Sequence, residues 1–169
     1  MKKTLTILSV VLLAAGGLFA QSTKNLTMTV NLSAWYDLSL SAASISFTDV
    51  APDIQAVPGT KSIAANEGAV SVRAFAVTGA GKTLSLTVKA NGDLVSGSDS
   101  IGIGAISWAS TGSGYVNGAM ATSNVTAGSW SGSILHWHEG SFTYSFLRDY
   151  TAQAPGTYTA SATYTLSAV

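Results

Sequence analysis

The chain contains no cysteine and only two glutamates, Glu67 and Glu139. Without cysteine there can be no disulfide, no thiol nucleophile and no cysteine-based zinc or iron–sulfur site. Nothing in the sequence pairs the two glutamates, and no Gly-x-Ser-x-Gly segment marks a nucleophile elbow. We therefore expect no catalytic residues, no cofactor and no enzymatic activity.

Charged residues are also scarce, at 9% of the chain against roughly 25% in typical globular domains. Removal of residues 1–20 would take Lys2 and Lys3, so the 8 basic and 8 acidic residues would become 6 and 8. A slight negative excess gives no electrostatic basis for binding nucleic acid or an anionic membrane. The surface must consist mainly of Ser, Thr, Gly and Asn, which is typical of secreted β-proteins, including those that pack against copies of themselves.

Residues 1–20 have the order of a bacterial secretory signal peptide. Lys2 and Lys3 precede an apolar stretch over 5–13, and small residues lead to Ala20 just before the polar Gln21. The apolar stretch is shorter than the roughly 20 residues that span a bilayer, and no second one follows. We expect residues 21–169 to form a single secreted domain without a membrane span, in the periplasm or on the cell surface of a bacterium.

The dominant pattern after residue 24 is alternation of apolar and polar residues. Strict alternation indicates half-buried strands, because successive side chains point to opposite faces of a sheet. Residues 26–40 would be long for one strand, so we predict two, over 26–32 and 35–40. The other predicted strands cover 44–47, 70–77, 83–90, 101–108, 142–146 and 157–166. The pattern predicts an all-β fold, an immunoglobulin-like antiparallel sandwich of seven or eight strands.

Three groups of side chains are candidates for ligand binding. His136 and His138 share one face of a strand and are weak candidates for a metal site, for which Glu139 points the other way. Trp35 and Trp137 are candidates for an exposed aromatic surface that binds carbohydrate. The oxygen-bearing side chains of the NGDLVSGSD segment could bind calcium, although turn formation explains them as well; they are Asn91, Asp93 and Asp99.

Two segments together resemble the spore coat protein U family and, more distantly, chaperone–usher pilins. NLTMTVNLSAWYDLSLSAASISFTDV, residues 25–50, is similar to the opening strands of that family. FTYSFLRDYTAQAPGTYTASATYTL, residues 142–166, is similar to its closing hairpin, in which Pro-Ala-Gly-x-Tyr leads into a Thr/Val-alternating last strand. The chain differs from the family in having no cysteine, in having Thr48 after Phe47 where glycine is usual, and in continuing the last strand to Val169.

The resemblance implies an incomplete sandwich that a strand from a neighbouring subunit completes. The donor face would be formed by Leu26, Met28, Val30 and Leu32, within a donor strand over 21–32. The groove would be lined by the terminal strand, which is expected to pair with 142–146; its inward residues are Tyr158, Ala160, Ala162, Tyr164 and Leu166. Because alternation is equally expected of any half-buried strand, 26–32 could instead be the first strand of a self-complete domain.

The leading hypothesis is a secreted structural subunit of a surface coat or pilus-like assembly. Its expected partners are copies of itself or related subunits, together with a periplasmic chaperone and an outer-membrane usher. The alternative is a monomeric cell-surface binding module for carbohydrate.

Overall fold

A computed structural model describes residues 24–50, 59–79, 81–131 and 136–169. The chain divides into two compact units, residues 1–32 and 33–169. In the first unit the described residues, 24–32, form no strand and no helix. The predicted signal peptide lies outside the described residues. Within the described ranges, no helix combines the length and apolar character needed to cross a membrane.

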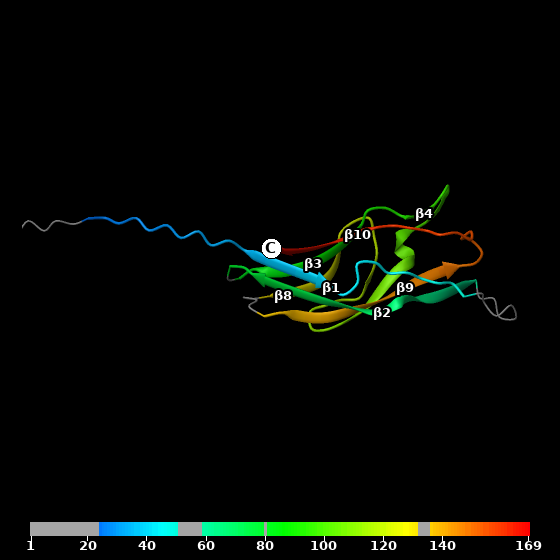
Figure 1. Ribbon diagram of the computed structural model, residues 1–169, viewed down its shortest axis with the longest axis horizontal. Coiled ribbons are helices and arrows are strands. Elements are labelled where there is room, and N and C mark those ends of the chain that lie inside the picture. Colours follow the sequence, from blue (N-terminus) through cyan, green and yellow to red (C-terminus); the bar gives the residue numbers. More distant parts are fainter. Residues whose placement is uncertain (1–23, 51–58, 80, 132–135) are drawn as a thin grey trace, which may run out of the picture. The chain divides into compact units, whose positions relative to one another are not determined.

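The second unit is built almost entirely of antiparallel strands in a sandwich-like arrangement (Figure 1). The larger sheet has the order β1-β2-β9-β6-β7, a smaller sheet has the order β10-β3-β8, and β4 and β5 form a separate pair. The strands are β1 (Trp35–Leu40), β2 (Thr60–Val77), β3 (Thr83–Ala90), β4 (Leu94–Ser96), β5 (Asp99–Ile101), β6 (Ile106–Thr111), β7 (Gly118–Ala119), β8 (Val125–Ser131), β9 (His138–Asp149) and β10 (Ala162–Ala168). A 3₁₀ turn, η1 (Ile103–Ala105), precedes β6. The all-β prediction is confirmed.

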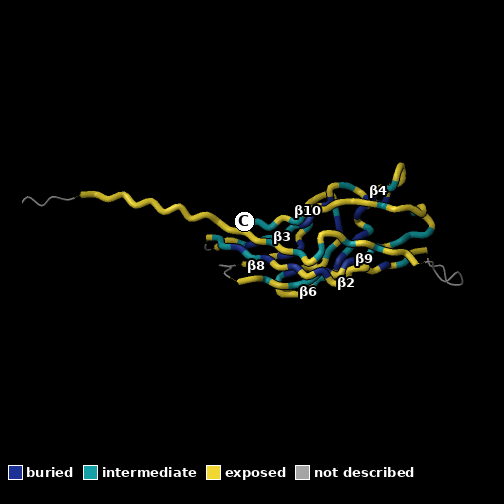
Figure 2. The backbone as a smooth tube through the Cα atoms, viewed as in Figure 1, coloured by how far each residue is buried: buried dark blue, intermediate teal, exposed yellow. Residues whose placement is uncertain are grey.

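The core lies between the two sheets and follows the alternation of the sequence. In β2, Val72, Ala74 and Ala76 are buried while the residues between them face outward. Leu86 in β3 and Phe142 in β9 are fully buried from the opposite layers. Figure 2 shows the buried positions concentrated between the layers, with exposed residues on the outer surfaces. Burial of one face of each strand removes apolar surface from water, and this stabilises the sandwich.

The predicted strand boundaries vary in accuracy. The predictions over 35–40 and 83–90 match β1 and β3 residue for residue. The prediction over 70–77 covers only part of β2, because the strand begins at Thr60 and continues through a register shift between Ala64 and Ala69. Gly68 lies in this irregularity with a φ of 68°, a left-handed conformation that glycine adopts without strain. The predicted strands over 26–32 and 44–47 are not strands in the structure.

The predicted hairpin between 142–146 and the terminal strand is wrong. Residues 142–146 lie in β9, which pairs with β2 and β6, whereas β10 pairs with β3 in the other sheet. The two segments meet face to face: Phe142 stacks on Tyr164 with ring centroids 6.0 Å apart. Alternation specifies which face of a strand is buried, but it does not specify which strand lies beside it. The first part of the predicted terminal strand, 157–161, is not part of β10: Thr159 forms an isolated bridge with Val95, and Ser161 O accepts a bond from Asn91 N at 2.9 Å.

Candidate functional site: an open seam between the sheets

One side of the sandwich is closed by hydrogen bonds between segments of the two sheets. The segment joining β6 to β7 bonds to β8, through Val116 N to Ala127 O at 3.1 Å and Ser129 N to Gly114 O at 2.8 Å. The Trp130 indole packs against this segment and donates to Ser113 O at 2.7 Å. Gly114 has a φ of 86°, and a Cβ there would collide with the Trp130 ring. The glycine- and serine-rich stretch around residue 114 therefore serves to cover this side.

The opposite side carries two strand edges without a partner among the described residues. β1 ends the larger sheet, β10 ends the smaller sheet, and the two strands approach each other. Thr83 and Val169 exchange both backbone hydrogen bonds, so the odd-numbered residues of β10 bond to β3. The even-numbered residues of β10 then direct their backbone N–H and C=O groups away from β3. In β1 the bond from Ser41 N to Ser71 O sets the same alternation.

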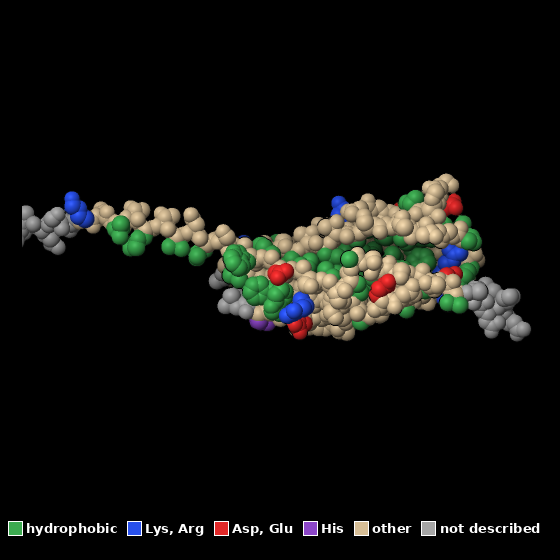
Figure 3. Space-filling model, in the orientation of Figure 1, with side chains coloured by type: hydrophobic (Ala, Val, Ile, Leu, Met, Phe, Trp, Pro, Cys, Tyr) green, Lys and Arg blue, Asp and Glu red, His purple; other side chains and the backbone are tan. Residues whose placement is uncertain are grey.

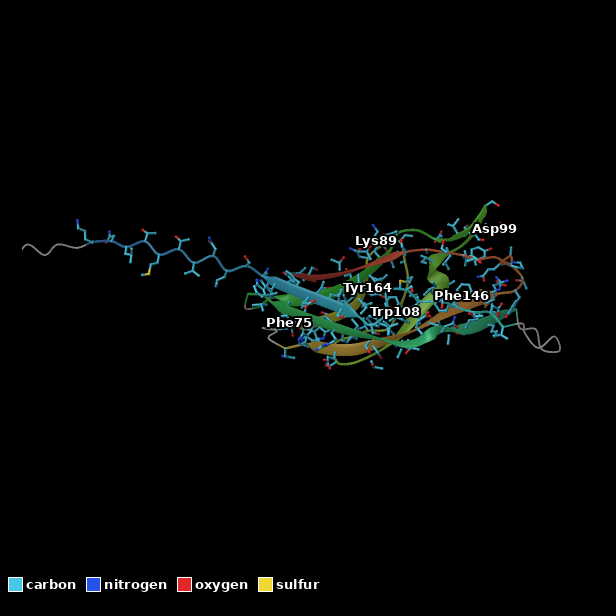
Figure 4. The ribbon with its side chains drawn as sticks, in the orientation of Figure 1. Phe75, Lys89, Asp99, Trp108, Phe146 and Tyr164 are labelled. Carbon is cyan, nitrogen blue, oxygen red and sulfur yellow. The ribbon has the colours of Figure 1, made fainter. Side chains whose placement is uncertain are left out.

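Partly buried apolar side chains of β1, β9, β10 and the segments next to β1 and β10 lie along this side of the sandwich, and we call them the open seam. Its residues pack against the core without being fully covered; they are Leu38, Leu40, Ala42, Ile45, Phe47, Phe146, Tyr158, Tyr164 and Leu166. Figure 3 shows hydrophobic side chains in the hollow between the two layers. In Figure 4 the labelled Tyr164 and Phe146 lie between the layers, on strands of opposite sheets. The open seam thus combines unpaired backbone groups with exposed apolar surface.

The extended segment 44–47, which borders the open seam, is held in place by hydrogen bonds of its Ser46 and has no regular strand ladder. Ser46 donates its backbone N–H and its hydroxyl to the Glu67 carboxylate at 2.9 and 2.8 Å. Asn66 N donates to Ser46 O at 2.9 Å. These bonds from Ser46 lower the pKa of Glu67 below its ordinary value. They fix the extended segment 44–47, whose Phe47 ring lies 5.9 Å from that of Phe146.

Two tyrosines form a hydrogen-bonded pair beneath the seam. The Tyr144 and Tyr164 hydroxyls lie 2.6 Å apart and come from opposite sheets. Burial raises the pKa of each phenol, and the neighbouring Tyr144 raises that of Tyr164 further. Both hydroxyls therefore stay neutral near pH 7, and their mutual bond satisfies polar groups that would be costly to bury alone.

The predicted groove residues differ in how far they are buried. Tyr158, Tyr164 and Leu166 are partly buried at the open seam, whereas Ala160 and Ala162 are exposed. The sequence did not point to Ile45 or Phe47, because the place of segment 44–47 depends on contacts with residues up to about a hundred positions away, such as that between the Phe47 and Phe146 rings. The Pro-Gly-x-Tyr signal found Tyr158, whose hydroxyl donates to Ala154 O at 3.1 Å.

The predicted donor face is exposed in full. The intervening residues are polar, so the apolar side chains lie along one side of the extended segment (Figure 3). No residue of 24–32 belongs to a strand, and Figure 2 shows the segment as exposed. The exposed fractions are 80% for Leu26, 80% for Met28, 77% for Val30 and 90% for Leu32. Such a row of apolar side chains in water is unfavourable until a partner covers it.

The candidate metal ligands His136 and His138 have aromatic rings as neighbours. The His138 ring stacks on Trp130 at 4.8 Å and lies 4.7 Å from the ring of His136. Burial, and then the charge of His136, lowers the pKa of His138. Glu139 instead pairs with Arg73 at 3.0 Å. Among the described residues, no group of three or more His, Cys, Asp or Glu side chains could hold a metal ion.

Two of the candidate calcium ligands, Asn91 and Asp93, form hydrogen bonds with residues distant from them in the chain. Asp93 accepts a hydrogen bond from Ile103 N, and Asn91 donates to the Ser161 hydroxyl, both at 2.9 Å. Asp99 begins β5. These contacts account for Asn91 and Asp93 without an ion.

Neither the protein-family models nor the curated proteins that were searched match this chain.

Proposed function

We propose that the protein is a secreted structural subunit that assembles by strand complementation. Residues 26–32 of one copy would enter the open seam of the next copy. The observation that carries this proposal is that one chain holds two complementary features. Residues 26–32 alternate, are exposed and belong to none of the described sheets. The sandwich has two strand edges without a partner among the described residues, beside the apolar open seam.

The chemistry of the two partners is complementary. Backbone groups of an added strand would pair with the free N–H and C=O groups of β10 or β1. Every second side chain of that strand would point into the seam. Burying a leucine, valine or methionine contributes about 1.5–3 kcal/mol per side chain before the costs of association. The donor face offers four such residues, Leu26, Met28, Val30 and Leu32.

Exchange between copies is favoured over a local hairpin by the residues that precede β1. Only Ser33 and Ala34 separate Leu32 from Trp35. Two-residue hairpin turns need positive φ angles and so prefer glycine, asparagine or aspartate. Ser33 and Ala34 therefore disfavour a turn that would fold 26–32 back along β1. An uncovered seam is also an aggregation risk before assembly, so a periplasmic chaperone that covers it and an outer-membrane usher are fitting partners for a secreted subunit of this kind.

The test compares two double variants of the secreted chain, residues 21–169. Met28→Asp with Val30→Asp places charge on the donor face, whereas Thr27→Asp with Thr29→Asp places the same charge on the opposite face. We expect the parent and the Thr variant to form concentration-dependent oligomers in analytical ultracentrifugation, and the Met28/Val30 variant to stay monomeric. A chain lacking 21–32 should bind a peptide of residues 24–34 in a one-to-one complex.

Hydrogen exchange identifies the binding site of that peptide. The amides of Tyr164 and Leu166 face the free edge, whereas those of Thr163 and Thr165 bond to β3. On peptide binding we expect the first pair to become protected if β10 is the acceptor edge, and Leu38 and Leu40 if β1 is. The proposal would be overturned by an intact chain that stays monomeric at all concentrations, or by two double variants that assemble equally well.

A further inference from the structure

The outer face of the larger sheet carries an aromatic surface remote from the core. Outward-facing positions of β1 and β2 lie beside each other, because Trp35 pairs with Val77 and Asp37 pairs with Phe75. The Trp137 ring lies 5.2 Å from the ring of Phe75. We call Trp35, Phe75 and Trp137 the aromatic platform. Trp35 is 69% exposed and Trp137 is 36% exposed, and Figure 4 places Phe75 at this end of β2.

The platform is held in place by a cation and a carboxylate. The Arg73 guanidinium lies 4.6 Å from the centroid of the Trp137 ring. Arg73 Nε is also 3.0 Å from the Glu139 carboxylate, and the two residues are cross-strand partners on β2 and β9. Cation–π contacts and ion pairs of this kind limit the freedom of the side chains involved. The indole of Trp137 is therefore presented in a defined position.

Polar groups border the platform on the same face. Next to Arg73 and Glu139 is an open hollow of about 340 Å³ that Ser71 and Gly140 also line. Beyond it, the Ser141 and Thr111 hydroxyls lie 2.8 Å apart. Hydroxyl, carboxylate and guanidinium groups thus adjoin exposed aromatic rings on one surface.

We propose that this surface binds an uncharged polysaccharide or oligosaccharide. A sugar ring has apolar C–H faces that pack on aromatic rings, and a rim of hydroxyls that bond to polar side chains. The Arg73 cation of the site is neutralised by Glu139, and Asp37 adds a negative charge beside Phe75. That charge balance disfavours a polyanion and fits a neutral glycan.

The spacing favours more than one sugar unit. Trp35 and Trp137 flank β2 on its two sides, and neighbouring strands lie about 4.8 Å apart. The backbones that carry the two indoles are therefore roughly 10 Å apart across the sheet. A linear oligosaccharide running across β1, β2 and the start of β9 would contact both rings and leave its hydroxyls near Arg73 and Glu139. This surface lies on the outside of the larger sheet, so its use would not depend on strand exchange.

The experiment uses the secreted chain, residues 21–169, and measures tryptophan fluorescence and NMR shifts during titration with maltoheptaose, cellohexaose and chitohexaose. Polygalacturonate serves as the anionic comparison. We expect saturable binding of at least one neutral oligosaccharide, and at least tenfold weaker binding after Trp35→Ala or Trp137→Ala. Tyr36→Ala is the matched control, because Tyr36 is an exposed aromatic next to Trp35 on the other face of β1. That variant should bind as the parent does.

Three outcomes would overturn the inference. They are no saturable binding to any neutral oligosaccharide, binding to polygalacturonate alone, and loss of self-association after Trp35→Ala without an effect on glycan binding; the last would make the platform a contact between copies. The Met28→Asp/Val30→Asp variant separates the two proposals, since it should lose assembly and keep glycan binding. Circular dichroism of each tryptophan variant confirms that the fold is retained.

Discussion

Residues 26–32 and 162–168 carry nearly the same alternating pattern, LTMTVNL and ATYTLSA, but differ in their surroundings. The second segment is β10, which bonds to β3 along its whole length. The first belongs to no strand, and its apolar side chains are exposed. The difference teaches that alternation makes a segment competent to be a strand, whereas a neighbouring edge decides whether it becomes one.

The neighbour of β10 is a strand with a fully buried face. Leu86 of β3 lies opposite Leu166, and Val88 lies opposite Tyr164. Both β3 residues are almost completely covered. The open seam leaves a corresponding place on the other side of β10, where no strand lies among the described residues. A second alternating segment of the same chain has the composition to occupy it.

Truncation of a buried side chain in β3, the strand beside β10, should distinguish the two segments most clearly. We expect Leu86→Ala to lower the free energy of unfolding by about 2–5 kcal/mol, because it leaves a cavity in the core. Val30→Ala should change it by no more than about 0.5 kcal/mol in dilute protein, because the proposed partner of residues 26–32 is a neighbouring copy. Urea unfolding followed by tryptophan fluorescence measures both. A loss similar to that of Leu86→Ala on truncating Val30 would show that residues 26–32 pack into the same domain.

The hydrogen bond between Tyr144 and Tyr164 joins β10 to β9 across the core. Its loss should lower the free energy of unfolding by less than Leu86→Ala does. Tyr144→Phe and Tyr164→Phe should each lower the free energy of unfolding by about 1 kcal/mol, since each leaves one buried hydroxyl without its partner. The double variant should lose less than the sum of the two, because it removes both hydroxyls together. A double-mutant cycle by urea unfolding measures the coupling, and strictly additive losses would contradict it.

The smallest effect concerns pH, because His138 is only partly buried and solvent screens its charge. The pKa of His138 is lower in the folded protein than its ordinary value of 6.5. As the pH falls below about 6.5, the unfolded chain binds the proton first. The free energy of unfolding should therefore decrease until the pH passes the pKa of the folded state. Residues 24–32 contain one ionisable side chain, Lys24, so the effect belongs to the sandwich.

Denaturant unfolding between pH 7.5 and pH 5 measures this dependence, roughly above the range in which carboxylates titrate. His138→Phe should flatten the profile across that interval. His136→Gln should reduce the slope in part, because the charge of His136 is the second cause of the lowered pKa. An unchanged profile in His138→Phe would place the responsible group elsewhere.

The sequence by itself determined the all-β fold, the limits of β1 and β3, and the inward direction of Tyr164 and Leu166 in β10. These features follow from local alternation, since successive side chains of a strand point to opposite faces whatever lies beside it. The same reasoning placed the apolar residues of 26–32 on one side of their segment and Trp35 on the polar side of its strand, and all of them are exposed.

Only the tertiary structure decided which strands are neighbours. The neighbouring strands in turn determine which residues meet at the open seam and at the aromatic platform. In the tertiary structure β10 pairs with β3, and Ser46 of segment 44–47 bonds to Glu67 and Asn66. The edges of β1 and β10 beside the open seam have no partner among the described residues. The tertiary structure also placed Arg73 between Trp137 and Glu139. These contacts join residues that are distant in the chain, and their geometry depends on the register between strands, which local alternation leaves undetermined.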